Sequence, residues 1–108
     1  TNKNIPRILV RYEDLVKDPT KEFNKVLGTL GMEIEQHQLD KSVRFSSFSE
    51  LEQQESISGF RERPPHAKRF FRQGLSGQWE DTLQRSQVKK IIAAHGKVMT
   101  KLGYETSL

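Results

Sequence analysis

Two adjacent prolines, Pro64 and Pro65, lie within a basic stretch that runs from residue 60 to residue 79. Each proline fixes its φ angle and lacks a backbone N–H, so no continuous helix can pass through this stretch. Glu62 is the only acidic residue in this stretch. The basic residues of the stretch fall within twelve positions: Arg61, Arg63, Lys68, Arg69 and Arg72. The sequence therefore predicts a long basic loop.

The second half of this stretch has the residue types that a phosphate-binding loop needs. Phe71 precedes Arg72, and Gly74 follows two residues later. The guanidinium offers a planar fork to an anion, and a glycine lets backbone N–H groups come close to it. A solvated basic loop with its aromatic side chains in the core fits the same spacing.

The composition indicates one domain, or part of one, with a modest core. Of the 108 residues, 33% are hydrophobic and 30% are charged, so we expect something outside the chain to complete the core. The net charge of +4 favours anionic partners. The absence of cysteine excludes a disulfide and a thiolate nucleophile, and no metal site is predicted. No apolar run could span a membrane, which predicts a soluble protein.

Residues 5–12 are predicted to form a strand, because Ile8, Leu9 and Val10 make a short apolar run typical of buried parallel strands. A lone strand cannot pair its own backbone groups, so it must join a sheet supplied from elsewhere. The predicted fold class is α/β, mostly helical with one parallel-type strand. Tyr12 ends this strand, where it either stacks on a bound base or lies in the core.

Three helices are predicted from capping residues and apolar periodicity. Asp18 caps a helix that Gly31 stops, residues 34–43 form a shorter helix, and residues 86–102 form the last one.

Two serines precede a weaker helical signal. Ser46 and Ser47, followed by Phe48, fit either a phosphate and ring contact or a helix N-cap beside a hydrophobic staple. One helical turn is predicted over residues 49–54, and the polar residues 52–59 are predicted to be mobile.

Three stretches together resemble the C-terminal part of the sulfotransferases that use 3′-phosphoadenosine-5′-phosphosulfate (PAPS). They are RYEDL at 11–15 followed by KDP at 17–19, SSF at 46–48, and FFRQG at 70–74 with Gly77, Trp79 and a closing LGY at 102–104. Their order and spacing match those of the family, and the resemblance spans essentially the whole chain.

The resemblance implies a three-layer α/β fold of the P-loop type, with residues 1–108 as the C-terminal segment of the domain. It also implies two sets of contacts with PAPS or with its product, adenosine 3′,5′-bisphosphate (PAP). The residues implied to hold the adenosine are Tyr12, Ser46, Phe48 and Phe71. The residues implied to hold the 3′-phosphate, in the place of the family's RKG-type motif, are Arg72, Gln73 and Gly74.

Residues 55–69 correspond to a variable loop that often covers the acceptor pocket in the family. The candidates for contacting the acceptor or gating cofactor release are Arg61, Arg63, His66 and Lys68. Gln73 departs from the family pattern, since many members have lysine there; weaker or differently distributed phosphate binding is therefore expected. The dimer motif of animal cytosolic members is not apparent, which favours a cytoplasmic bacterial or otherwise divergent enzyme and leaves the oligomeric state open.

The family's 5′-phosphosulfate loop and catalytic base both lie upstream of the matching region. No glycine-rich Lys-Ser/Thr loop occurs in this sequence, so no catalytic residue is assigned. The chain alone is predicted to be inactive and to need the missing N-terminal half, or a partner chain that supplies it.

The predicted function is part of a sulfotransferase that moves a sulfuryl group from PAPS to a hydroxyl or amine of a small molecule or saccharide. One alternative is a stand-alone basic module that binds nucleotides or polyanions, and another is a non-catalytic partner segment. A nucleic-acid partner is not expected, because the cations concentrate in one stretch and the rest of the chain mixes both signs.

Overall fold

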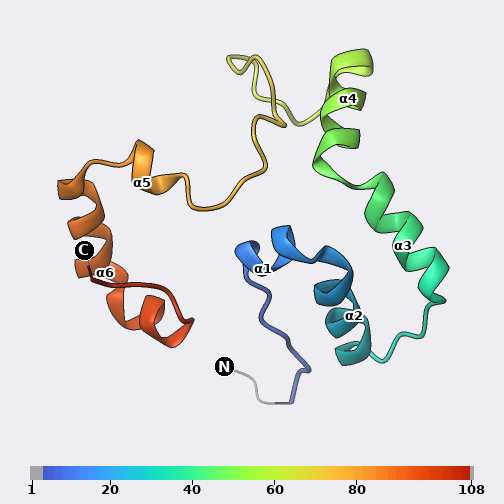
Figure 1. Ribbon diagram of the computed structural model, residues 1–108, viewed down its shortest axis with the longest axis horizontal. Coiled ribbons are helices and arrows are strands. Elements are labelled where there is room, and N and C mark those ends of the chain that lie inside the picture. Colours follow the sequence, from blue (N-terminus) through green and yellow to red (C-terminus); the bar gives the residue numbers. More distant parts are fainter. Residues whose placement is uncertain (1–3, 108) are drawn as a thin grey trace. The chain divides into compact units, whose positions relative to one another are not determined.

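The computed structural model describes residues 4–107, which form helices joined by loops (Figure 1). The chain divides into two units, Thr1–Ser76 and Gly77–Leu108. The helices of the first unit are α1 (Tyr12–Lys17), α2 (Pro19–Thr29), α3 (Gln36–Phe45) and α4 (Phe48–Ser58). Those of the second unit are α5 (Trp79–Thr82) and α6 (Arg85–Lys101). The first unit ends with residues 60–76, which we call the basic loop.

The predicted strand over residues 5–12 is wrong, and so is the α/β class that was based on it. The part of the chain that the structure describes has no strand, and residues 5–11 lead without regular structure into α1 (Figure 1). The apolar run at residues 8–10 finds no second strand with which to exchange backbone hydrogen bonds, and an unpaired strand is not stable. Tyr12 instead begins α1.

The helix predicted after Asp18 is confirmed as α2. The carboxylate of Asp18 accepts a hydrogen bond from the N–H of Lys21 at 3.2 Å. Pro19 occupies the first helical position, where its missing N–H costs nothing. Gly31 has a φ of +69°, a conformation that favours glycine and ends the helix.

The helix predicted over residues 34–43 is confirmed as α3, shifted by two residues, whereas α4 is longer than predicted. Residues 52–59 were expected to be a mobile segment, but α4 continues through Ser58. Ser47 caps its start by accepting a hydrogen bond from the N–H of Glu50 at 3.4 Å. Gly59, with a φ of +74°, follows its last residue. The Ser47 cap at one end and Gly59 at the other mark the bounds of α4, whose polar composition gives little helical periodicity.

The last predicted helix is confirmed as α6. Its C-terminus has the expected glycine, since Gly103 has a φ of +81°. The N–H of Tyr104 then donates to the carbonyl of Met99 at 2.8 Å, which satisfies a carbonyl of the last turn.

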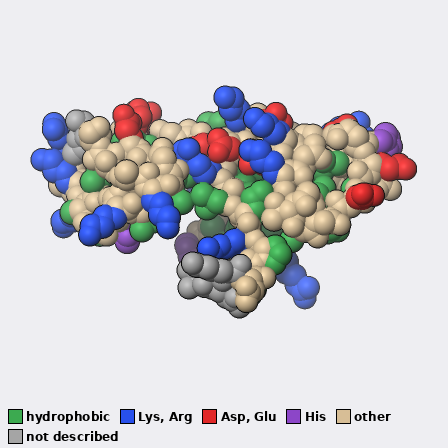
Figure 2. Space-filling model, turned by 90° about the horizontal axis from the view of Figure 1, so that it is seen from below, with side chains coloured by type: hydrophobic (Ala, Val, Ile, Leu, Met, Phe, Trp, Pro, Cys, Tyr) green, Lys and Arg blue, Asp and Glu red, His purple; other side chains and the backbone are tan. Residues whose placement is uncertain are grey.

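The hydrophobic core is small. Among the described residues, the buried hydrophobic side chains are Leu39 in the first unit and Val88 in the second. Many larger apolar side chains reach the surface, and Figure 2 shows hydrophobic atoms between the charged ones. No helix in the described part of the chain has both the length and the apolar character needed to cross a membrane.

Candidate functional site

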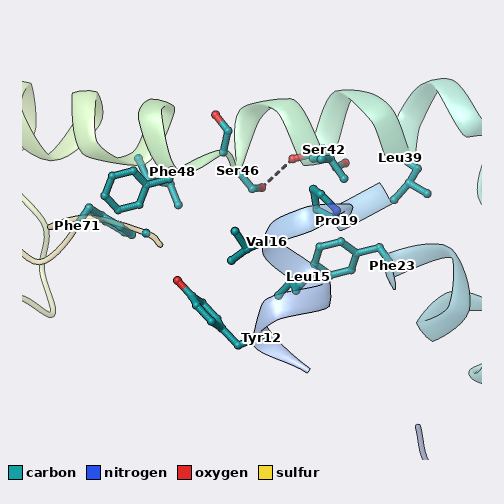
Figure 3. A pocket seen from close by; sticks show the side chains of 14 residues that line it. Tyr12, Leu15, Val16, Pro19, Phe23, Leu39, Ser42, Ser46, Phe48 and Phe71 are labelled. Atoms are coloured by element: carbon teal, nitrogen blue, oxygen red, sulfur yellow. Dashed lines mark hydrogen bonds between the residues drawn. The ribbon is translucent and has the colours of Figure 1, made fainter. Parts of the chain in front are cut away.

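The first unit contains an open cavity of about 640 Å³ between its helices and the basic loop (Figure 3). Its walls are mostly apolar, and a few hydroxyl groups lie along one side. The residues that line it are Tyr12, Leu15, Val16, Pro19, Phe23, Leu39, Ser42, Val43, Ser46, Ser47, Phe48, Leu51, Phe71 and Gly74. A cavity of this size, apolar with a few polar groups, is typical of small-ligand sites.

Most of the residues predicted to hold the cofactor meet at this cavity. They come from three separate parts of the chain: the start of α1, the junction of α3 with α4, and the basic loop (Figure 3). Those that line the cavity are Tyr12, Ser46, Phe48, Phe71 and Gly74. Arg72 and Gln73 do not line it, but they connect Phe71 to Gly74 along the chain.

Aromatic rings border the cavity from two sides. The rings of Phe48 and Phe71 meet edge to face, with centroids 6.3 Å apart and planes at 75°. Tyr12 belongs to α1, is 50% exposed, and points its hydroxyl toward the side where these two rings lie (Figure 3). Aromatic side chains so placed can stack on or abut a flat heterocycle such as a nucleobase.

The serines at the α3–α4 junction make hydrogen bonds with the backbone of the two helices. Ser47 is the N-cap of α4, so the capping interpretation of this residue is confirmed. The hydroxyl of Ser46 donates to the carbonyl of Ser42 at 2.8 Å (Figure 3). Ser46 can therefore accept a hydrogen bond from a ligand as it stands, but it would donate to a phosphate only by giving up the bond to Ser42.

The basic loop is closed on itself by aromatic and polar contacts. The ring of Phe60 lies against those of Phe70 and Phe71, with centroid distances of 4.7 and 4.9 Å. These contacts bring the two ends of the segment 60–71 together. Between them, the guanidinium of Arg63 donates to the carbonyl of Lys68 at 2.9 Å. Arg63 thus has a structural role in the loop.

A buried glutamate, which sequence reasoning missed, anchors this loop to α4. Glu55 is only 6% exposed. Its carboxylate accepts hydrogen bonds from the N–H of Phe70, at 2.8 Å to Oε2 and 3.0 Å to Oε1, and from the N–H of Phe71, at 3.2 Å to Oε1. Glu55 lies four residues after Leu51, which lines the cavity, and so lies on the same side of the helix. That spacing would have identified Glu55 as inward-facing, had α4 been predicted to its full length.

Gly74 lines the cavity and lies so close to the Phe48 ring that a side chain does not fit at this position. Its φ is +63°, and a Cβ atom built there would lie 2.6 Å from Cγ of Phe48. A side chain would therefore clash with the aromatic wall as well as strain the backbone. The approach of backbone N–H groups to a phosphate, for which the sequence analysis singled out this glycine, stays a prediction.

The residues predicted to contact the acceptor are not part of the cavity wall. All of them are exposed and none lines it: Arg61, Arg63, His66 and Lys68. Within residues 4–107, none of the loop cations forms an ion pair with a carboxylate. The acceptor role of these residues stays a prediction.

A comparison with protein families decides the relationship that the motifs suggested. The family model of the sulfotransferase domain matches residues 3–103. The chain belongs to the sulfotransferase domain family. This assignment places it in a family of transferases and confirms the resemblance drawn from the sequence.

Curated relatives of the sulfotransferase chain agree with this assignment. It is 25% identical to Sulfotransferase 1A1 of Rattus norvegicus over 93% of its own length and 36% of the relative's. It is 28% identical to Sulfotransferase 1A1 of Canis lupus familiaris, over 91% of its own length and 35% of the relative's. It is 30% identical to Sulfotransferase 1 family member D1 of Mus musculus, over 82% of its own length and 31% of the relative's. The chain thus spans about a third of the length of the relatives it matches. No solved structure matches it.

Proposed function

We propose that this chain forms the cofactor-binding segment of a sulfotransferase that moves a sulfuryl group from PAPS to a hydroxyl or amine acceptor. The observation that carries the proposal is the meeting of distant residues at one cavity. The family resemblance implies that Tyr12, Phe48 and Phe71 hold the adenosine, and all three line the same cavity. Membership in the sulfotransferase family supplies the reaction type.

The size and the mostly apolar lining of the cavity support it as the place of the adenosine part of PAPS. The aromatic side chains would hold the adenine by stacking and edge contacts. The 3′-phosphate would lie beside Arg72, which is exposed and makes no ion pair among the described residues. The backbone turns sharply at Gly74 and reaches the cavity wall, which supports a close approach of backbone N–H groups to that phosphate.

Other parts of the catalytic apparatus are not assigned to this chain. Sulfuryl transfer needs a base for the acceptor and cations for the leaving phosphate. The relatives are about three times as long as the chain, and the printed sequence has no glycine-rich Lys-Ser/Thr loop. We therefore propose that an N-terminal half, in the same chain or in a partner, supplies these groups and that residues 1–108 are inactive alone.

The acceptor is proposed to be a small molecule or a saccharide that approaches the basic loop. Arg61, His66 and Lys68 are exposed there and available for polar contacts. Arg63 is less available, because its guanidinium already closes the loop onto Lys68. A cytoplasmic location and a bacterial origin stay predictions of the sequence.

The test of the proposed function compares two nucleotides that differ in the 3′-phosphate. In the full-length protein, Arg72→Ala should weaken binding of PAP by at least about tenfold and leave binding of adenosine 5′-monophosphate nearly unchanged, since a charge-assisted contact contributes about 1.5–3 kcal/mol. Arg69→Ala removes the same charge from the same loop and is the matched control. Calorimetric titration measures both affinities, and equal losses for the two nucleotides would remove the 3′-phosphate assignment.

A second candidate function is a stand-alone module for polyanions or nucleotides. The specific observation in its favour is that the loop cations are exposed and form no ion pair within the described residues. Such a module would bind many anions with a steep dependence on salt, whereas a PAPS site would prefer adenosine nucleotides and form a one-to-one complex.

A further inference from the structure

We propose that Glu55 is a positioning residue for the nucleotide site: it fixes the backbone of Phe70 and Phe71, and through it the Phe71 ring and the Arg72 that follows. The inference rests on the proposed function. Glu55 is a residue of α4 to which neither the residue pattern nor the family resemblance assigns a role.

The Glu55 carboxylate holds the backbone of Phe70 and Phe71, and we call these hydrogen bonds the clamp. Both carboxylate oxygens face the basic loop, and they accept hydrogen bonds from two consecutive backbone N–H groups, those of Phe70 and Phe71. Within residues 4–107 no cation pairs with this carboxylate. A buried carboxylate must be satisfied by hydrogen bonds, and bonds to an ionised acceptor are the strong ones. The loop backbone is therefore part of what makes this buried charge stable.

The clamp determines which donors of the loop remain for an anion. The N–H groups of Phe70 and Phe71 are occupied by Glu55, so the first N–H available to a phosphate is that of Arg72. The negative charge of the Glu55 carboxylate would also repel a phosphate from the N–H groups of Phe70 and Phe71. Glu55 thus directs the 3′-phosphate to Arg72 and to the backbone leading to Gly74.

The clamp also orders the loop before a ligand binds. The carboxylate holds the backbone from α4, while the Phe60 ring contacts Phe70 and Phe71 from within the loop. Together these contacts fix the edge-to-face packing of Phe71 on Phe48 at the cavity wall. A loop that is ordered in advance avoids the entropy cost of ordering on binding, which raises affinity without a new ligand contact.

The chain contains a matched control for this residue. Glu22 in α2 is also 6% exposed, but its carboxylate pairs with Lys25 in the same helix at 3.2 Å. It contacts no residue of the basic loop through any hydrogen bond in the described chain. Glu22→Gln therefore removes a buried charge without touching the loop.

The experiment measures nucleotide selectivity in the full-length protein carrying Glu55→Gln or Glu22→Gln. Glutamine keeps the size of the side chain but replaces one accepting oxygen with an NH₂ group that cannot accept. We expect Glu55→Gln to lower the ratio of PAP affinity to adenosine 5′-monophosphate affinity by about fivefold to tenfold. Glu22→Gln should leave the ratio unchanged. A merely structural role for Glu55 would lower the melting temperature and leave the ratio intact, and that result would overturn the proposal.

A second measurement needs no substitution. Amide hydrogen exchange of the unmodified protein should find the Phe70 and Phe71 N–H groups protected, against rapid exchange at exposed loop residues such as Arg61. Rapid exchange at both phenylalanines would overturn the clamp even if Glu55→Gln failed to fold. If the unmodified protein does not prefer PAP over adenosine 5′-monophosphate, the proposed function fails; if it does and Glu55→Gln keeps that preference, only the role of Glu55 fails.

Discussion

Two glutamates of this chain are equally buried and bond to very different partners. Glu22 in α2 and Glu55 in α4 are both 6% exposed, and both helices have 11 residues. The carboxylate of Glu22 contacts Lys25, three residues ahead in the same helix. That of Glu55 contacts backbone groups 15 and 16 residues ahead, in the basic loop.

Burial alone therefore does not identify a functional carboxylate. The contact of Glu22 stabilises one helix and forms as soon as that helix does. The contact of Glu55 forms only when the basic loop has folded back on α4, so it couples a helix to the proposed phosphate-binding segment. The distance along the chain between partners, rather than the exposed area, separates the two roles.

The largest expected effect that separates them is on stability. We expect Glu55→Ala to lower the free energy of unfolding by about 2 kcal/mol more than Glu22→Ala, because it leaves the Phe70 and Phe71 N–H groups without their acceptor. Glu22→Ala leaves only Lys25, whose side chain is 53% exposed and can bind water. Urea denaturation of the two variants measures the difference. Equal losses would mean that the loop contacts of Glu55 contribute nothing to the fold.

A smaller difference in stability is expected between alanine variants of two glycines that both have positive φ angles. Gly59 and Gly74 both have positive φ, but a Cβ at Gly59 would meet no atom within 4 Å, whereas one at Gly74 would meet the Phe48 ring. Gly59 has φ of 74° and ψ of 177°, so alanine there adds backbone strain alone, about 1–3 kcal/mol. At Gly74 the clash with Phe48 adds about 1–2 kcal/mol more and displaces the cavity wall.

Thermal unfolding and PAP titration of Gly59→Ala and Gly74→Ala would compare the two positions. We expect Gly74→Ala to weaken nucleotide binding and Gly59→Ala to leave it unchanged. Loss of binding in both variants would show that the loop conformation as a whole, rather than the contact with Phe48, limits the site.

The smallest effect concerns the caps of the two helices that carry the glutamates. Asp18 accepts a hydrogen bond from the N–H of Lys21 at the start of α2, and Ser47 accepts one from the N–H of Glu50 at the start of α4. Replacing either cap with alanine should cost about 1 kcal/mol of stability. Neither change should alter the ratio of PAP to adenosine 5′-monophosphate affinity in calorimetric titration. A fall in that ratio for Ser47→Ala would show that the start of α4 takes part in selectivity.

Local signals in the sequence predicted α2, α3 and α6, but not the short helices α1 and α5. Asp18 and Gly31 marked the ends of α2, and Gly103 marked the end of α6, because caps and glycines act within a few residues. The strand over residues 5–12 was wrong because a strand depends on partners that a local apolar run cannot supply. The full length of α4 was missed because its polar residues give little periodicity.

The candidate site was predicted in part. Phe48, Phe71 and Gly74 were named from the family resemblance, and the structure brings them together at one cavity. The spacing from Leu51 could have identified Glu55 as inward-facing, but not its partners, because these are backbone groups 15 and 16 residues away that carry no sequence signature. The acceptor residues in the basic loop stay predictions, since none of them lines the cavity.

The most direct test of the central claim is a calorimetric titration of the full-length protein with PAP at two salt concentrations. The account predicts saturable one-to-one binding that is tighter than for adenosine 5′-monophosphate and that weakens only moderately when salt is raised, because aromatic contacts with the adenine supply part of the affinity. Binding that does not saturate at one site, or that disappears with added salt as for a general polyanion module, would contradict the account.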